Sequence, residues 1–168
     1  MLVKCNKQNN QRGIGLLELM LSLSIIAILL VMATRYYISA NQSQQISNSV
    51  SMVSGVISGG ANYSTQNNGS YANVSLLSLV QGGYIPASFC GSGNANGTCT
   101  GQGADPFHGD LNVSPVAANN YQITMNNIPT NICPSVANMV NASIENTQVG
   151  GNSSNAACNG QTLVVTVY

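Results

Sequence analysis

Charged side chains are scarce in this sequence of 168 residues, where they make up 5% of the chain as four Lys or Arg and four Asp or Glu. Beyond residue 13, Arg35 is the one basic side chain. Binding of nucleic acid through its phosphates requires clustered Lys and Arg. We therefore expect no direct nucleic acid binding. A surface with so little charge also does not repel copies of itself.

Histidine occurs once, as His108, and the sequence has no phosphate-binding glycine motif and no nucleophile elbow. A catalytic triad needs a serine and an acid that both meet a histidine. Asp105 and Asp110 flank His108, but two carboxylates without a ligand-rich loop make a poor calcium site. A zinc site is disfavoured because no Cys-x-x-Cys pair is present. We expect neither an enzyme nor a bound metal or cofactor.

The sequence does contain a long apolar segment, residues 13–34, in which Glu18 is the one charge. About 20 apolar residues, at about 1.5 Å of rise each, cross the hydrocarbon core of a bilayer. Lys4, Lys7 and Arg12 precede the segment, which favours a cytoplasmic N-terminus. A carboxylate inside hydrocarbon costs at least ~2.5 kcal/mol and usually marks a function. The bland alternative is a tolerated charge near the membrane edge.

Residues 11–18, Gln-Arg-Gly-Ile-Gly-Leu-Leu-Glu, and the apolar helix after them resemble the class III leader of type IV prepilins and pseudopilins. In that family a glycine precedes the cleaved bond and a glutamate is the fifth mature residue. This register fits cleavage between Gly13 and Ile14 better than cleavage after Gly15. The resemblance implies a prepilin peptidase and N-methylation of Ile14, although the family's usual first residue is Phe or Met. It also implies that Glu18 attracts the Ile14 amine of a neighbouring subunit during assembly.

A second apolar pattern follows the membrane segment. Its side chains recur every three or four residues, at Ile46, Val50, Val53 and Ile57. This spacing predicts one stripe on a helix, and Gly59-Gly60 predicts the end of that helix. After the leader, residues 1–13, we therefore expect a long helix over 14–58. Its first part, 14–34, spans the membrane before assembly, and its second part packs on a head.

Residues 59–168 predict a small α+β head. Segments of β-forming residues bounded by Gly, Pro and Asn turns occur at 111–116, 121–126 and 162–168. The last is apolar enough to be a central strand. A short helix is expected at 76–80, and loops at 91–103 and 149–155. The order of these segments resembles that of type IVb pilins, and the resemblance implies a further short helix at 132–140. It implies the type IV pilin fold, with a long N-terminal helix packed on a small antiparallel sheet.

Five cysteines are present, and Cys5 lies in the leader. The other four allow three pairings, and the oxidising compartment beyond the membrane favours disulfides. Cys90 and Cys99 bracket a loop rich in Gly and Asn. The type IVb resemblance implies that Cys133, which follows an Ile-Pro element, pairs with Cys158 just before the last strand.

The resemblance implies a subunit of a type IV pilus. Its precursor would lie in the bacterial inner membrane with a periplasmic head. A pilus assembly platform would polymerise it into a helical homo-oligomer on the cell surface, for adhesion, aggregation, motility or uptake. A type II secretion pseudopilin is the alternative, and a single-span anchor for a periplasmic binding domain is the second. The expected disulfides favour the pilus, and the anchor leaves the leader unexplained. Asn-x-Ser/Thr sequons such as Asn62, Asn68 and Asn96 carry no weight in a chain this rich in Asn and Ser.

Overall fold

The computed structural model describes residues 15–92, 98–144 and 154–168. The predicted cleavage site at Gly13 and Ile14 lies outside these residues, as does Cys5. The chain forms two compact units, Met1–Asn41 and Gln42–Tyr168. We call the second unit the head.

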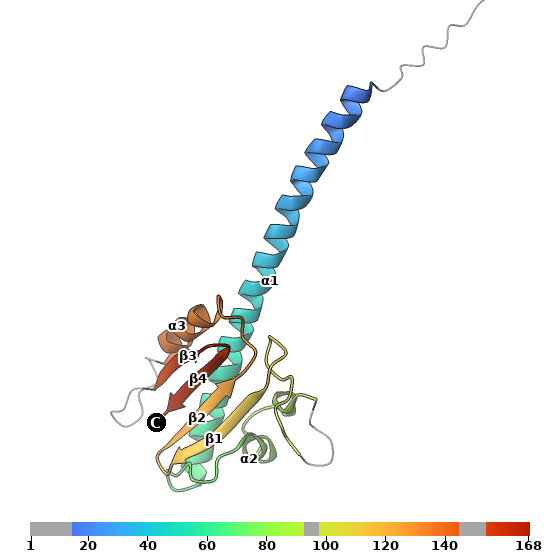
Figure 1. Ribbon diagram of the computed structural model, residues 1–168. Helices are drawn as coiled ribbons and strands as arrows, with labels where there is room; N and C mark the ends of the chain where they lie inside the picture. Colours follow the sequence, from blue (N-terminus) through green and yellow to red (C-terminus); the bar gives the residue numbers. More distant parts are fainter. Residues whose placement is uncertain (1–14, 93–97, 145–153) are drawn as a thin grey trace, which may run out of the picture. The chain divides into compact units, whose positions relative to one another are not determined.

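One helix, α1 (Leu16–Gln66, 51 residues), runs through both units (Figure 1). All its residues up to Asn41 are exposed. This helix is long and apolar enough to cross a membrane. In the head, the apolar stripe of α1 faces the core, where Val53, Val56 and Ile57 are buried. The predicted long N-terminal helix is confirmed.

The predicted end of α1 at residue 58 is wrong, because the helix continues through Gly59 and Gly60 to Gln66. A Cβ atom on Gly59 would overlap the side chain of Ile85, and one on Gly60 would overlap the hydroxyl of Tyr121. The two glycines therefore allow the rest of the head to approach α1 closely. This packing outweighs the cost of about 1 kcal/mol that glycine adds inside a helix.

The helix ends instead at a second glycine signal. Asn68 and Gly69 both adopt positive φ angles, 55° and 79°, and the Gly69 amide donates to the Ser64 carbonyl at 2.9 Å. Left-handed residues after the last turn are the usual way in which a helix satisfies its final carbonyls. A glycine thus does end α1, nine residues beyond Gly60.

The head contains a four-stranded antiparallel sheet with the order β1-β2-β4-β3. Its strands are β1 (Leu111–Ala117), β2 (Asn120–Met125), β3 (Asn155–Asn159) and β4 (Thr162–Val167). Val113 pairs with Ile123, and Ile123 pairs with Val165 across the three longer strands. The three predicted strands are present, and β4 is central as expected. Strand β3 was not predicted, and its first residue falls in a segment expected to be a loop.

The described part of the head also contains three short helices: α2 (Leu76–Gln81), the 3₁₀ helix η1 (Ala87–Cys90) and α3 (Cys133–Ile144). Ser75 and Ser78 form a reciprocal capping box that begins α2. Helix α3 was expected from the resemblance to type IVb pilins, but it ends four residues later than expected.

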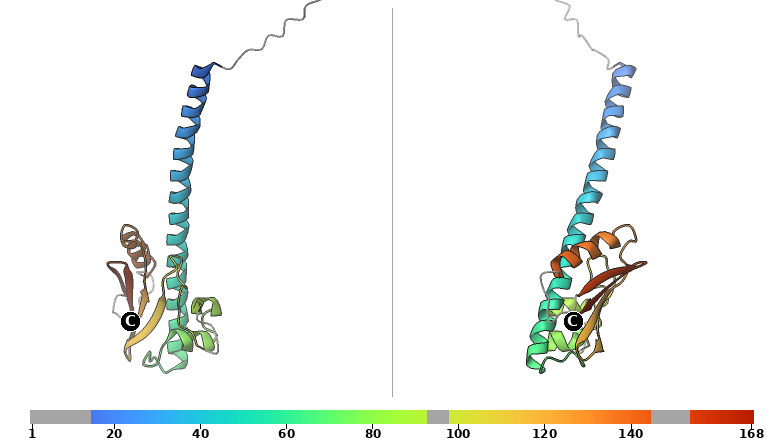
Figure 2. Two further views of the ribbon diagram at one scale, coloured as in Figure 1. Left: turned by 45° about the vertical axis from the view of Figure 1, so that its right-hand side comes forward. Right: turned by 90° about the vertical axis from the view of Figure 1, so that its left-hand side faces the viewer.

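The core lies between one face of the sheet and the helices, and Figure 2 shows the second half of α1 running along that face. Alternate strand residues point into it, as the period of a half-buried strand requires. The buried strand residues include Leu111, Val113, Tyr121, Ile123, Met125, Leu163 and Val165. Val136 and Val140 of α3 belong to the same cluster. The α+β pilin-like architecture is confirmed.

Two disulfides cross-link the head. They join Cys90 to Cys99 and Cys133 to Cys158, the pair that the type IVb resemblance implies. The second bridge ties the first residue of α3 to strand β3 across a sequence separation of 25. A loop of this length is expected to add about 3 kcal/mol to the free energy of unfolding in the chain-entropy picture.

Candidate functional site

Glu18 lies in the first turn of α1. The Gly15 carbonyl accepts hydrogen bonds from the amides of Glu18 at 2.9 Å and Leu19 at 3.2 Å, so the helix begins at this glycine. A carboxylate in the first turn interacts favourably with the free amides and the positive end of the helix dipole. The helix therefore offsets part of the cost of this charge in hydrocarbon, although the described part of the chain brings no basic side chain near it.

The first unit offers Glu18 no partner within its own helix. Arg35, the other charged residue of the described part of this unit, lies 17 residues further along α1. At about 1.5 Å of rise per residue the two are about 25 Å apart. A counter-charge for Glu18 must therefore come from outside the described part of the unit.

The hydroxyl groups between these two charges are all satisfied inside the helix. Ser22 and Ser24 donate to carbonyls of the preceding turn at 2.9 Å, and Thr34 does so at 3.0 Å. Such back-bonding hides a hydroxyl from the lipid. The surface that α1 presents between its two charged residues is therefore effectively apolar.

Arg35, Tyr36 and Tyr37 close the apolar segment. Both tyrosines are strongly exposed, Tyr36 at 79%. Tyrosine and arginine at the end of a spanning helix prefer the boundary between lipid and water. These aromatic residues were missed in the sequence analysis, although their position directly after the apolar run could have identified them. Their position is the one expected for the end of a membrane-spanning segment.

The prokaryotic N-terminal methylation motif matches residues 8–34. The match includes Gly13, Ile14 and Glu18 and extends to the end of the apolar segment, so the class III prepilin leader is confirmed. No curated protein and no solved structure matches the chain. The motif indicates a prepilin of the type IV pilin or pseudopilin kind, anchored in the membrane as a precursor and assembled into a multimer. Proteins of this family are structural subunits.

In the head, the stretch around His108 is a tight turn built on Asp105. The side chain of Asp105 is 3% exposed, and its Oδ1 accepts hydrogen bonds from the amides of Phe107 at 2.8 Å and Gly109 at 2.7 Å. Burial raises the pKa of Asp105, although these two amides and His108 act in the opposite direction. The carboxylate thus stabilises the turn by accepting hydrogen bonds from two of its backbone amides.

The second acid of this stretch has a different partner. Asp110 is exposed, and its Oδ1 accepts from the Gly103 amide at 3.2 Å. Within the residues that the structure describes, no three His, Cys, Asp or Glu side chains gather as metal ligands would. Each of the two carboxylates holds a separate piece of backbone.

The turn is also fixed to its neighbours. Gln45 of α1 donates to the Pro106 carbonyl at 3.3 Å, and Asn127, just after β2, donates to the Phe107 carbonyl at 3.2 Å. These contacts join α1, the turn and the end of β2 into one unit. The arrangement explains how an Asp-Pro-aromatic-x-Gly sequence stabilises the fold.

Asn141 of α3 closes one edge of the sheet. Its side-chain amide accepts from the Ala156 amide at 2.7 Å and donates to the Ala156 carbonyl at 2.9 Å. It thereby satisfies both outward backbone groups of a residue on strand β3, as a neighbouring strand would. No feature of the sequence alone indicated this contact.

Proposed function

We propose that this chain is a structural subunit of a type IV pilus. Prepilin peptidase removes the leader after Gly13, Ile14 becomes the methylated N-terminus, and mature chains polymerise through the apolar part of α1 into a surface filament. The methylation motif and the fully exposed apolar surface of residues 16–34 support this proposal. Such a surface is stable in lipid or against other apolar helices, but it is unfavourable in water.

The bridge between Cys133 and Cys158 is the observation that favours a pilus subunit over a pseudopilin. Cys133 follows Ile128-Pro129 in the sequence, and its bridge joins α3 to β3, the strand beside β4. This is the arrangement expected from the type IVb resemblance. A small head supplies limited stability from its core, and a long-loop disulfide is a common way to add to it. That reinforcement suits a filament exposed outside the cell.

Glu18 has the role of an assembly contact in this proposal. In the described part of its own helix Glu18 has no basic side chain nearby, and cleavage at Gly13 would create a positively charged amine at Ile14. Burying either charge alone in an apolar bundle is costly, whereas a pair cancels both. The amine of Ile14 in one subunit and the carboxylate of Glu18 in its neighbour are such a pair.

Electron microscopy of sheared surface filaments from wild-type, deletion and complemented cells tests the proposal. We expect filaments that contain the mature chain and are lost on deletion. Unchanged filaments together with a defect in protein secretion would instead identify a pseudopilin.

Processing is tested separately by mass spectrometry of the membrane fraction. The mature chain should begin at Ile14 with a methylated amine, and Gly13→Leu should accumulate the full precursor because the peptidase no longer accepts the junction. A mature chain that begins beyond Ala33 would contradict the leader assignment.

A further inference from the structure

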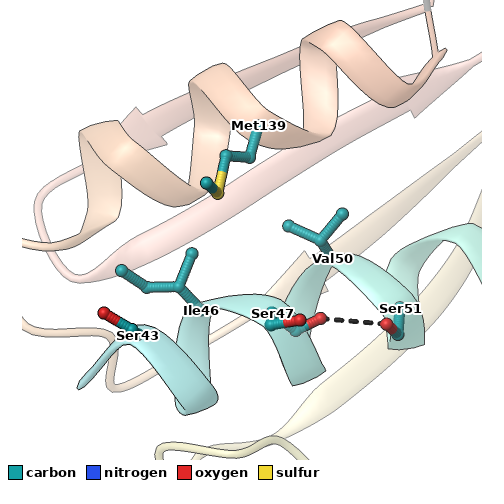
Figure 3. A pocket seen from close by; sticks show the side chains of 6 residues that line it. All are labelled: Ser43, Ile46, Ser47, Val50, Ser51 and Met139. Carbon is teal, nitrogen blue, oxygen red and sulfur yellow. Dashed lines mark hydrogen bonds between the residues drawn. The ribbon is translucent and has the colours of Figure 1, made fainter. Parts of the chain in front are cut away.

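A groove runs between α1 and α3 in the head. In Figure 3, Met139 of α3 points toward Ile46 and Val50 of α1, and these side chains form the apolar lining of a hollow of about 380 Å³. Ser43, Ser47 and Ser51 complete it. The Ser51 hydroxyl is turned back onto its own helix, where it donates to the Ser47 carbonyl at 3.0 Å. The hollow therefore presents mainly carbon atoms.

A second hollow, of about 320 Å³, continues the same line along α1. Ile57 and Ala61 of α1 and Ile144 of α3 contribute its apolar lining. Ser54 and Ser143 also line this second hollow, and their hydroxyls lie 3.2 Å apart and join the two helices. Together the hollows extend from Ser43 to Asn62 of α1, a length of about 28 Å at the rise of an α-helix. None of their lining residues is charged.

We propose that this groove receives residues 16–34 of a second copy of the chain in the assembled polymer. The proposal rests on the proposed function, because it requires the chain to polymerise. The apolar segment extends about 27 Å, which matches the length of the groove. Both surfaces are apolar, and neither brings a charge to the contact except for Glu18 at one end of the helix. A hydrophobic groove that receives the apolar face of a helix is a common mode of recognition.

The membrane explains why the contact belongs to the polymer. In the inserted monomer, lipid covers residues 16–34, while the head and its groove lie beyond the bilayer. The helix can reach a groove only after it has left the lipid, and at that moment its exposed leucine, isoleucine and valine side chains need a new apolar cover. The groove supplies part of that cover.

The contact also has the symmetry that a filament needs. One subunit contributes a helix and the other contributes a groove, so the two surfaces differ. Such heterologous contacts repeat without limit unless the rotation between subunits closes a ring. Each added subunit exposes a fresh copy of both surfaces.

The edges of the sheet are poor competitors for this role. Asn141 occupies both outward backbone groups of Ala156 on β3. At the other edge, β1 contains Pro115, which lacks an amide hydrogen, and its register shifts between Pro115 and Ala117. Both features oppose the addition of a strand from another subunit.

Photo-crosslinking tests the contact without assuming a register. A photoreactive amino acid replaces Met139, which is 55% exposed, and sheared polymer is irradiated beside the membrane-bound monomer. Dimer bands are digested with chymotrypsin, since Arg35 is the one basic residue of the mature chain. We expect dimers in the polymer alone, with residue 139 joined to residues 16–34. Dimers joined solely to residues 42–168, or no dimer in normally assembled polymer, would overturn the proposal.

A matched pair of charge substitutions gives a second test. Met139→Lys places a cation in the groove and should lower the yield of polymer about tenfold or more, the equivalent of about 1.4 kcal/mol or more per contact. Val116→Lys adds the same charge at a site of similar exposure, 58%, on strand β1, and should assemble normally. Equal yields from both variants, with the processed monomer present in equal amounts, would contradict the role of the groove.

Failure of the proposed function has a different signature. Wild-type cells that make processed chain but no sedimentable polymer would refute the pilus and this contact together. Normal wild-type polymer with unaffected Met139→Lys refutes the contact alone.

Discussion

The N-terminal unit and the head differ in what surrounds their apolar side chains. In residues 16–41 every side chain is exposed, so lipid or another subunit must cover the apolar ones. In the head the apolar side chains cover one another, around a core that includes Tyr121, Ile123 and Leu79 at full burial. Substitutions in the first unit should therefore act on assembly, and substitutions of buried residues in the head should act on folding.

Glu18→Val should give the largest effect and should act on assembly alone. The substitution removes a charge from hydrocarbon, which would otherwise cost at least ~2.5 kcal/mol, so insertion and cleavage should be at least as good as in wild type. In the polymer the Ile14 amine would lose its partner and would be buried unpaired. Processed monomer should accumulate in the membrane, and filaments should be few or absent.

The measurement compares processed chain with sheared filaments on immunoblots. Glu18→Asp should be intermediate, because its carboxylate reaches one methylene less far. Normal filaments built from Glu18→Val subunits would show that the charge is merely tolerated.

Cys133→Ser tests the other side of the comparison. Loss of the bridge to Cys158 should lower the free energy of unfolding of the head by about 3 kcal/mol and leave membrane insertion unchanged. Cys90→Ser opens a shorter loop, of sequence separation 9, and should be milder. Proteolysis of the mature chain in detergent with thermolysin measures both, since the head contains no Lys or Arg for trypsin. Equal resistance of both variants and wild type would contradict the expected order.

Gly60→Ala sharpens the comparison within α1 itself. An added methyl group on Gly60 would overlap the Tyr121 hydroxyl, so we expect a loss of about 1–3 kcal/mol from overpacking, despite the better helix propensity of alanine. Gly15→Ala provides the control, because a Cβ there meets nothing within 4 Å. Urea unfolding followed by tyrosine fluorescence would separate the two variants.

Tyr121→Phe adds a rescue test. The Tyr121 hydroxyl is buried and has no hydrogen-bond partner in the part of the chain that the structure describes, and burial raises its pKa. Its removal should cost little, and it should recover part of the stability that Gly60→Ala loses. Strictly additive effects of the two substitutions would show that the methyl group and the hydroxyl do not meet.

The same contrast explains how far the sequence alone could predict the structure. In the first unit the described helix could be predicted from the sequence, because a long apolar run is a local signal that needs no partner. In the head, β1, β2 and β4 were predicted from their own residues. Strand β3 was missed since Asn-Ala-Ala-Cys-Asn has little β-propensity, and β4, Asn141 and a disulfide hold it in place.

The end of α1 failed for a related reason. Glycine pairs commonly end helices, and only the position of Tyr121 and Ile85 in the fold shows that Gly59 and Gly60 serve close packing. The groove between α1 and α3 is equally non-local. Its two sides lie about 90 residues apart in sequence, as the contact between Ser54 and Ser143 illustrates.

The smallest expected effect concerns the pH dependence of the head, and it arises at Asp105. Burial raises the pKa of this carboxyl above the usual 3.8, while the amides of Gly109 and Phe107 and the charge of His108 lower it and Asp110 raises it. At pH values between 3.8 and the raised pKa, Asp105 holds a proton in the folded head and releases it in the unfolded chain. The contribution of Asp105 to stability therefore falls as pH rises through this window and stays constant above it.

Mild acidification from neutral pH should accordingly stabilise the head, in contrast to the loss expected for a carboxylate in an ion pair. Asp105→Asn keeps an oxygen for both turn amides but cannot titrate, so the gain on acidification should disappear. Its stability at neutral pH should differ from wild type by less than about 1 kcal/mol, because the removed charge is offset by an amide group without an acceptor. Asp110→Asn, at an exposed site, should retain most of the gain. Urea unfolding of the three chains across this pH range decides the matter: an acid gain that persists in Asp105→Asn would place its origin in another group.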